Sequence, residues 1–329
     1  MRLFLVDDKT CFDPWRNLAL EECLLDACEE QDAILYLWQN AQTVVIGRNQ
    51  NPWRECRTEL LEMEGGRLAR RITGGGAVFH DLGNLNFSFI AGKAVYDVSR
   101  HLKVVLDAVK SVGVQAEFSG RNDILSEGRK FSGNAFAHRQ SASLHHGTLL
   151  ISADMSMLGR YLQPSQAKMA SKGVQSVQSR VVNLSELNAD ATVENLRQAL
   201  KESFQMEYGP YGPYCQSDGF SMVDKEHLER LQARQRSWEW RFGQTPRFDV
   251  SLQCRFQWGG VEMELISRDG RVAEAKIFSD GMDAAVFPML AEALLGRLFS
   301  PAVLAAALRS ASDSVEAFDV AQWLEQCQF

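Results

Sequence analysis

The chain has 329 residues, of which 45% are hydrophobic and 23% charged, so it can build a large globular core. Its 35 Lys and Arg residues against 42 Asp and Glu residues give a net charge of −7, which argues against a general nucleic-acid-binding surface. We find no secretory signal, no apolar run of about 18 residues and no paired spacing among the seven cysteines, and we expect a cytoplasmic protein with no membrane partner.

One stretch departs from the overall negative charge. Residues 121–180 contain eight Lys and Arg residues against three Asp and Glu residues. We interpret this stretch as a candidate wall for an anionic ligand, with a solvated basic face as the alternative.

The first half of the chain mixes helices with short strands. Residues 13–30 predict a helix with Asp13 as N-cap and Pro14 in its first turn. Two strand pairs, read as hairpins, follow at residues 33–48 and 77–91, on either side of a glycine-rich loop. The remaining elements are helices at residues 99–113 and 192–209 and short strands at residues 114–119, 121–126, 129–140 and 144–152.

The pattern changes near Thr245 and Pro246. Residues 249–280 predict strands with Gly-Gly and Asp-Gly turns, and residues 290–299 and 302–308 predict two closing helices. This order predicts an α+β protein with a large domain at residues 1–246 and a small α+β accessory domain at residues 247–329.

The sequence "RRITGGGAVFHD", residues 70–81, raises the question of why three glycines follow two arginines. Glycine permits positive φ and lets backbone N–H groups approach a ligand closely, and a neighbouring arginine favours an anion such as phosphate. A tight turn between strands is the alternative for the glycines alone.

Other familiar motifs fail. The loop is not G-x-G-x-x-G, and "GRKFSGNA" has Asn134 and Ala135 where a P-loop needs Lys and Ser or Thr. No zinc-binding His and Cys spacing and no G-x-S-x-G elbow is present.

Five polar signatures instead follow one another on short strands: "RRITGGGAVFHD", "GRNDI", "GRKFSGNA", "HHGTLL" and "SKGVQSVQSRVVNL". With "FDPWRNLALEE", "TVVIGRNQNPWREC", "SWEWRFGQTPRF" and "FSDGMD", they resemble the biotin/lipoate ligase superfamily, and within it the two-domain bacterial lipoate–protein ligase A type. The likeness runs almost from end to end and implies a mixed or antiparallel sheet in the catalytic domain.

The resemblance implies a two-step reaction. Lipoate and ATP, with Mg²⁺, give lipoyl-AMP and pyrophosphate, and the lipoyl group then passes to a lysine of an apo lipoyl domain. The implied acceptors are the E2 subunits of 2-oxoacid dehydrogenases and the glycine cleavage H protein, and the implied state is a monomer.

The resemblance also assigns roles to residues. Lys130 matches a catalytic lysine that contacts both ATP and lipoate, and a fixed cation there suits a step in which a carboxylate attacks a phosphate. The implied ATP-binding residues are Arg71, Gly76, Ala77, Val78, Phe79 and Lys130. The implied lipoate-binding residues are Lys130, Trp38, Gly75 and His146, with Val45, Gly47 and Gly147 nearby.

Supporting roles are less specific. His80 and Asp81 are expected to fix the glycine loop. Asn122 and Asp123 have three open roles: holding Lys130, a magnesium ion or the adenylate ribose, so no metal ligand is assigned. Arg70 is expected to face away from Arg71 in a structural role. Asn134 departs from the family pattern, in which a second small residue is more usual.

Three rival functions remain. An octanoyl or lipoyl transferase of the same fold needs a cysteine thiolate and no ATP. No cysteine occurs between residues 57 and 214, which span the signatures, although Cys56 and Cys215 flank that stretch. A biotin–protein ligase fits less well, because its glycine-rich loop differs from residues 74–76. A non-enzymatic lipoate-binding protein also fits less well, because Lys130 and Arg71 are both present.

Overall fold

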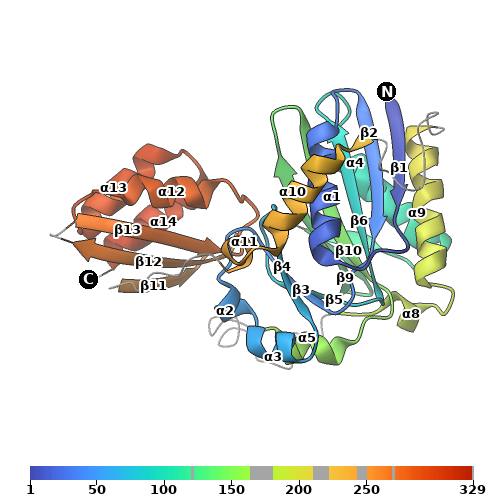
Figure 1. Ribbon diagram of the computed structural model, residues 1–329, viewed down its shortest axis with the longest axis horizontal. Helices are drawn as coiled ribbons and strands as arrows, with labels where there is room; N and C mark the ends of the chain where they lie inside the picture. Colours follow the sequence, from blue (N-terminus) through green and yellow to red (C-terminus); the bar gives the residue numbers. More distant parts are fainter. Residues whose placement is uncertain (120–121, 164–180, 210–221, 243–249, 269–270, 328–329) are drawn as a thin grey trace.

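The computed structural model describes residues 1–119, 122–163, 181–209, 222–242, 250–268 and 271–327. A seven-stranded sheet forms the centre of the larger part of the molecule (Figure 1). Its first two strands are parallel and the other neighbouring pairs are antiparallel. Across the sheet the strands are β1 (Arg2–Asp7), β2 (Asp32–Trp38), β6 (Asn84–Gly92), β10 (Ala142–Leu150), β9 (Arg129–His138), β8 (Asp123–Ser126) and β7 (Glu117–Ser119).

Helices cover both faces of this sheet. On one face, α4 (Val98–Ser111) and α9 (Val193–Tyr208) pack on alternate residues of β2 such as Leu35 and Leu37. On the other, α1 (Pro14–Ala27) and α10 (Lys225–Arg236) pack with Tyr36 and Trp38. Successive strand residues point to opposite faces, so β2 is buried throughout and contributes to two cores.

The predicted helix ends have clear local causes. The side chain of Asp13 accepts a hydrogen bond from Trp15 N at 3.0 Å and caps α1, as the sequence predicted. Asp97 caps α4 in the same way, and Gly113, with a φ of 81°, follows the end of that helix.

The two predicted hairpins are wrong. In the structure β3 (Thr43–Ile46) pairs with β4 (Arg67–Arg70) and β5 (Val78–His80) in a separate three-stranded sheet, whereas β2 and β6 pair with each other in the large sheet. Each short turn therefore carries the chain from one sheet to the other. The glycine-rich loop, residues 71–77, connects β4 to β5, the two outer strands of the small sheet.

The C-terminal part has a sheet and a core of its own. The strands β11 (Val250–Arg255), β12 (Gly260–Arg268) and β13 (Arg271–Ser279) form an antiparallel sheet that packs on three helices, away from the large sheet (Figure 1). The helices are α12 (Val286–Leu294), α13 (Pro301–Ala311) and α14 (Val315–Gln326). The sequence predicted two closing helices and missed α14. The predicted boundary near residue 246 lies outside the described residues.

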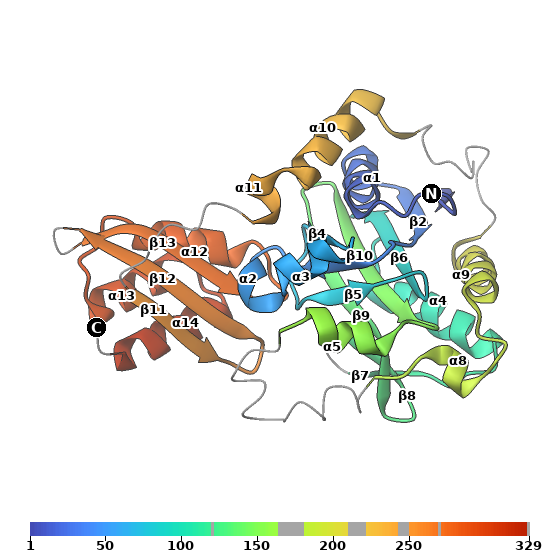
Figure 2. The same ribbon diagram turned by 60° about the horizontal axis from the view of Figure 1, so that its bottom comes forward.

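Several helices have no counterpart in the sequence prediction. Figure 2 shows α10 lying beside α1, with α11 (Trp238–Arg241) at the end of α10 that is nearer the C-terminal part. The others are α2 (Pro52–Glu55), α3 (Thr58–Met63), α5 (Met155–Tyr161) and α8 (Leu184–Leu187). Within the described parts of the chain, no helix combines the length and apolar character needed to cross a bilayer.

Candidate active site

The guanidinium of Arg71 shapes the glycine loop from inside. Arg71 is buried, and its Nη2 donates hydrogen bonds to the carbonyls of Gly74 at 2.7 Å and Gly76 at 2.8 Å. Gly75 between them has a φ of 91°, a conformation that favours glycine. Burial lowers the pKa of Arg71 to about 10, so the side chain stays charged at neutral pH. In this structure its donors hold loop carbonyls, and its predicted contact with phosphate stays a prediction.

A buried polar chain leads from the loop to helix α1. Arg71 Nε donates to Thr73 Oγ1 at 3.0 Å, and that hydroxyl lies 2.9 Å from His146 Nε2. The other ring nitrogen of His146 lies 2.9 Å from a carboxylate oxygen of Glu21. Glu21 is almost fully buried. His146, a predicted lipoate-binding residue, is thus connected to the glycine loop through a single hydroxyl.

The same carboxylate connects to Trp38, another predicted acyl-site residue. Trp38 Nε1 donates to Ser88 Oγ at 3.0 Å, and Ser88 Oγ donates to Glu21 Oε1 at 2.5 Å. The sequence analysis missed Glu21. Its position among apolar residues offered a signal, because it lies three residues after Leu18 and four before Leu25, on the buried face of α1.

Lys130 lies on β9 beside Asp123, the first residue of β8. Lys130 Nζ and Asp123 Oδ1 form an ion pair at 2.6 Å, and both side chains are about one-third exposed. The pairing of β8 and β9 shifts between Ile124 and Leu125, which places a bulge next to Lys130. A bulge redirects side chains, and Lys130 Nζ lies only 3.0 Å from the point that a Cβ on Gly133 would occupy.

The C-terminal part reaches this site through residues 279–284. Gly75 N donates to Gly281 O at 2.9 Å, so one amide of the glycine loop is bound to the C-terminal part. Met282 Sδ lies 3.8 Å from Asn122 Nδ2 and 3.4 Å from the position of a Cβ on Gly75. Met282 therefore lies between the glycine loop and the residue that precedes Asp123. This brings two of the predicted signatures together.

His80 and Asp81 hold neighbouring parts of the chain. His80 is fully buried, its Nδ1 lies 3.1 Å from Asn40 Nδ2, and burial lowers its pKa to about 3. Asp81 accepts hydrogen bonds from Gly83 N at 2.8 Å and Asp154 N at 2.7 Å. These bonds connect His80 to the turn before β3, and Asp81 to the turn after β5 and to the start of α5, rather than to the glycines themselves.

Arg70 has the structural placement that strand alternation predicted. Its guanidinium points away from Arg71 and donates to main-chain carbonyls, including Gln50 O at 2.7 Å and Trp240 O at 2.8 Å. It thereby joins the segment after β3 to α11. Burial lowers the pKa of Arg70 to about 9.

The other predicted acyl-site residues lie near the glycine loop. Trp38 and Val45 belong to one buried cluster. A Cβ on Gly47 would come within 2.1 Å of Gly75 O, so this glycine permits the close approach of β3 to the loop. Ala77, Val78 and Phe79 run from the loop into β5, and Phe79 is buried against Tyr161.

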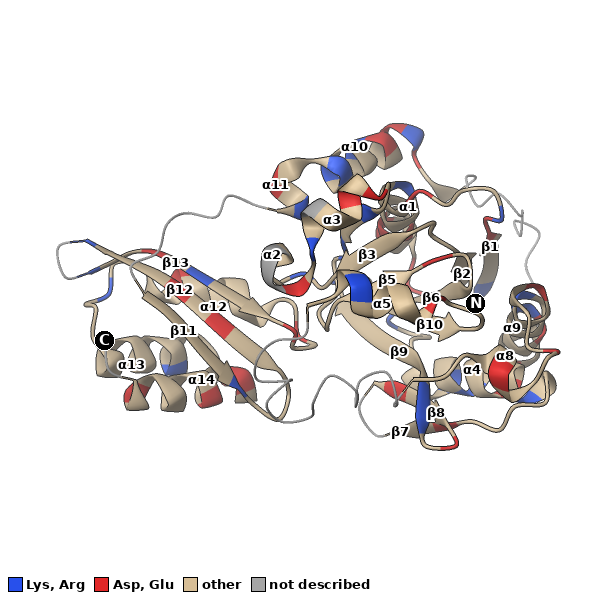
Figure 3. Cartoon of the chain, turned by 90° about the horizontal axis from the view of Figure 1, so that it is seen from below, with Lys and Arg blue, Asp and Glu red and all other residues tan. Residues whose placement is uncertain are grey.

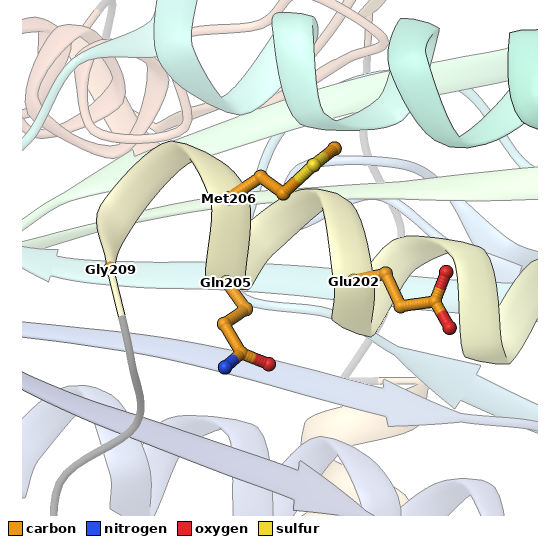
Figure 4. A pocket seen from close by; sticks show the side chains of 4 residues that line it. All are labelled: Glu202, Gln205, Met206 and Gly209. Atoms are coloured by element: carbon orange, nitrogen blue, oxygen red, sulfur yellow. The ribbon is translucent and has the colours of Figure 1, made fainter.

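The hollow drawn in Figure 4 belongs elsewhere. It has a volume of about 420 Å³, lies on α9 and is lined by Glu202, Gln205, Met206 and Gly209. It contains none of the candidate site residues.

The predicted basic wall is not continuous over the residues that the structure describes. Arg129, Lys130, Arg139 and Arg160 each form an ion pair with a carboxylate, and the other four basic residues of the stretch lie outside the described parts. Figure 3 shows basic and acidic residues side by side on α10 as well. The described members of the stretch therefore fit a solvated, paired surface.

Two further chemistries find little support. Among the described residues, no cluster of three His, Cys, Asp or Glu side chains could hold a metal ion. Cys56 is buried, and burial raises its pKa to about 12, which disfavours the thiolate that a transferase needs. Cys215 lies outside the described residues.

Comparisons with known proteins agree with this geometry. Residues 13–205 match the model of the lipoyl protein ligase A/B catalytic domain, and residues 245–324 match that of the bacterial lipoate protein ligase C-terminus. The chain is similar to LipL1 of P. falciparum, solved in complex with lipoate, with 29% identity, a TM-score of 0.85 and coverage of 99% of both chains.

Two more solved structures cover about three-quarters of the chain. One is a bipartite lipoate protein ligase from Thermoplasma acidophilum, described with its E2 lipoyl domain, at 26% identity and a TM-score of 0.64 over 76% of this chain and 98% of that one. The other is a lipoate-protein ligase A bound with ATP, at 27% identity and a TM-score of 0.60 over 74% of this chain and 98% of that one.

Proposed function

The chain belongs to the lipoyl protein ligase A/B family, and from this premise we propose that it is an ATP-dependent lipoate–protein ligase. It activates lipoate to lipoyl-AMP with release of pyrophosphate, and it then transfers the lipoyl group to a lysine of an apo lipoyl domain. The observation that carries the proposal is that Met282 contacts both Asn122, just before the β8–β9 pair that contains Lys130, and Gly75 of the glycine loop.

Lys130 supplies the cation of the first step. The lipoate carboxylate attacks the α-phosphorus of ATP, so two anions approach each other while negative charge builds on the phosphate. A fixed ammonium between them stabilises the transition state by roughly 2.7–4 kcal/mol, by analogy with one oxyanion donor. Asp123 pairs with Lys130 at 2.6 Å and holds the ammonium in position for the two anions.

The glycine loop binds the nucleotide. Gly76, Ala77, Val78 and Phe79 present main chain to the adenylate, and Arg71 keeps the loop in shape through the carbonyls of Gly74 and Gly76. ATP use is supported by the similar lipoate-protein ligase A that was solved with ATP. Magnesium enters with the phosphates of ATP rather than through a cluster of protein ligands.

The lipoyl chain occupies the apolar side of the loop, against Trp38 and Gly75, with His146 beside it. Trp38 and His146 are both connected to Glu21 by hydrogen bonds, Trp38 through Ser88, so one carboxylate orients two side chains of the proposed lipoyl site. Lipoate as substrate is supported by the lipoate complex of the similar P. falciparum protein.

In the second step the ε-amine of an acceptor lysine attacks the acyl carbonyl of lipoyl-AMP. An amide bond forms, AMP leaves, and Lys130 polarises the carbonyl. The proposed acceptors are E2 lipoyl domains of 2-oxoacid dehydrogenases and the glycine cleavage H protein. The similar T. acidophilum ligase is described with an E2 lipoyl domain, which supports the first of these. A monomeric state and a cytoplasmic location remain predictions.

The rival transferase is less well supported. It needs a cysteine thiolate beside the acyl group. The candidate site is built around Lys130 instead, and Cys56, the described cysteine next to the signatures, is buried with its pKa raised to about 12.

Pyrophosphate release tests the proposal. We expect purified protein to release pyrophosphate only when both ATP and lipoate are present, and to lipoylate an apo lipoyl domain. Lys130→Ala should lose both pyrophosphate release and transfer from supplied lipoyl-AMP. Arg129→Ala is the matched control, because this neighbouring cation pairs with exposed Glu127 at 3.3 Å and should remain active. Transfer from an acylated carrier protein at full rate without any nucleotide would instead favour the transferase.

A further inference from the structure

The main-chain carbonyl of Asn122 is held by two donors from one residue. Asn134 donates to Asn122 O from its backbone N at 2.8 Å and from its side-chain Nδ2 at 3.0 Å. Asn122 immediately precedes Asp123, whose carboxylate pairs with Lys130. The Asn134 side-chain amide therefore holds the main chain immediately before Asp123, the residue that pairs with Lys130.

The oxygen of the same side-chain amide contacts a buried histidine. Asn134 Oδ1 lies 2.9 Å from His145 Nε2, and His145 Nδ1 lies 3.3 Å from His101 Nδ1 on α4. A carbonyl oxygen accepts only, so Asn134 Nδ2 must face Asn122 and its Oδ1 must accept from His145. Neutral His145 then carries its proton on Nε2, and His101 must carry one on Nδ1. One main-chain carbonyl thus sets the tautomers of two histidines.

All three side chains are buried. Asn134, His145 and His101 are at most 3% exposed. The ring of His145 stacks on Phe136 with centroids 4.7 Å apart, and the ring of His101 stacks on Phe89 at the same separation. Hydrogen bonds strengthen in such surroundings, and an unpaired donor there is costly, so the three orientations are strongly coupled.

The neighbouring strand is shaped around the amide. Gly147 pairs with Asn134 across β9 and β10, and a Cβ on Gly147 would come within 2.8 Å of Asn134 Oδ1. The same position lies within 2.4 Å of Phe87 Cζ, so the missing side chain at Gly147 leaves room for both the Phe87 ring and the Asn134 amide.

We propose that Asn134 and His145, oriented by His101, are positioning residues for Lys130, acting through Asn122 and Asp123. The inference rests on the proposed function, because it assigns these residues to the lysine of the adenylation step. They do not touch the substrates. They hold the β8 end of the Lys130–Asp123 pair, so their loss allows the ammonium to move from the place where carboxylate and phosphate meet.

Two substitutions of one histidine provide the sharpest test. In His145→Gln the side-chain amide nitrogen occupies the place of Nε2 and can donate to Asn134 Oδ1, whereas in His145→Asn it occupies the place of Nδ1 and cannot. We expect kcat for lipoate-dependent pyrophosphate release to fall between about 10- and 100-fold in His145→Asn and Asn134→Ala, with KM within about threefold, because a displacement near 1 Å costs about that much. His145→Gln should stay within about threefold of wild type.

The control is His138→Ala. His138 lies on the same strand as Asn134 and its Nδ1 contacts Ser143 Oγ at 2.9 Å, so this variant removes a histidine hydrogen bond from the same strand pair without touching Asn122. It should retain wild-type kcat. Equal loss in His145→Gln and His145→Asn, unchanged kcat in Asn134→Ala, or a change in KM alone would overturn the inference.

A second measurement needs no variant and no activity. In ¹⁵N-histidine-labelled protein at neutral pH, NMR should show His145 as the neutral Nε2–H tautomer and His101 as the neutral Nδ1–H tautomer. The opposite tautomer in His145 would overturn the proposed chain of contacts. If the wild type shows these tautomers but releases no pyrophosphate, the proposed function fails while the local geometry stands.

Discussion

Buried ionisable side chains form the framework of the candidate active site. Burial lowers the pKa of His80 and of His101 to about 3, and burial also lowers the pKa of His145 well below its ordinary value. These histidines are therefore neutral at physiological pH and act through fixed hydrogen bonds. Arg71 stays charged because its pKa, lowered by burial, is still about 10. Arg71 thus keeps its positive charge at neutral pH, while His80, His101 and His145 carry none.

The neutral histidines predict a pH dependence of stability. A histidine with a pKa near 3 in the folded protein stays neutral there, whereas in the unfolded chain it takes up a proton below about pH 6.5. The free energy of unfolding therefore falls by about 1.4 kcal/mol for each pH unit below that value. His80→Gln should therefore lose less stability than wild type between about pH 6.5 and pH 5, by roughly 2 kcal/mol. Urea unfolding at both pH values measures this difference.

The control for this measurement is His227→Gln. His227 lies partly exposed on α10, beside Asp26 at 3.0 Å, so its replacement should not relieve the loss of stability at low pH. An equal loss in wild type and His80→Gln would show that His80 accepts a proton in the folded protein.

Among the elements, the β8–β9 pair carries the most specific feature, the bulge beside Lys130. Residues three apart on a regular strand point to opposite faces, yet Lys130 Nζ lies 3.0 Å from the Cβ position of Gly133. The bulge directs Lys130 toward Asp123, and the missing side chain at Gly133 leaves room for its ammonium. One irregularity in the pairing therefore places Lys130, the proposed catalytic lysine.

Gly133→Ala tests this arrangement. The new methyl group meets only the flexible end of Lys130, at 3.0 Å from Nζ and 3.2 Å from Cε, so the fold should survive while the ammonium is displaced. We expect pyrophosphate release to fall by about tenfold or more. Ser132→Ala is the control, since the hydroxyl of Ser132 is buried with no hydrogen-bond partner among the described residues. If both variants match wild type, the position of Lys130 does not depend on the missing side chain.

At the scale of the whole molecule, the C-terminal part closes directly on the glycine loop. Gly75 N donates to Gly281 O at 2.9 Å, and Asn49 Nδ2 donates to Ala284 O at 2.9 Å. One amide that could bind an anion is therefore held by the chain itself. We propose that this part matters more for activation than for transfer, because it covers the loop that is assigned to the nucleotide.

Gly74→Ala should weaken this closure. A Cβ there would come within 2.3 Å of Gly281 O and 2.6 Å of Met282 O, which are main-chain atoms that cannot swing aside. We expect a larger radius of gyration in small-angle X-ray scattering and reduced pyrophosphate release, with transfer from supplied lipoyl-AMP retained. Gly76→Ala is the matched control for the radius of gyration, which it should leave unchanged, because its Cβ would meet nothing within 4 Å among the described residues. An unchanged radius in Gly74→Ala, or equal loss of both half-reactions, would contradict the closing role.

The sequence alone determined the family, the α+β class and the local ends of the main helices. These rest on short-range physics: Asp13 can cap only the helix that follows it, and Gly113 ends the helix before it. The roles of Arg71 and Lys130 were predicted from the resemblance of their motifs and remain to be tested. The match to the ligase models confirms the family assignment itself.

Only the tertiary structure decided which strands pair and which buried groups meet. A short turn between two strands predicts a hairpin, whether the strands pair with each other or lie in two different sheets. The sequence therefore predicted that β2 pairs with β3, although the two strands lie in different sheets. The contacts from Asn134 through His145 to His101 join two strands and a helix, and those from Glu21 join α1 to β6 and β10. Such contacts form between residues far apart in the chain, and local periodicity carries no record of them, because it reports which face a residue occupies and not what lies opposite.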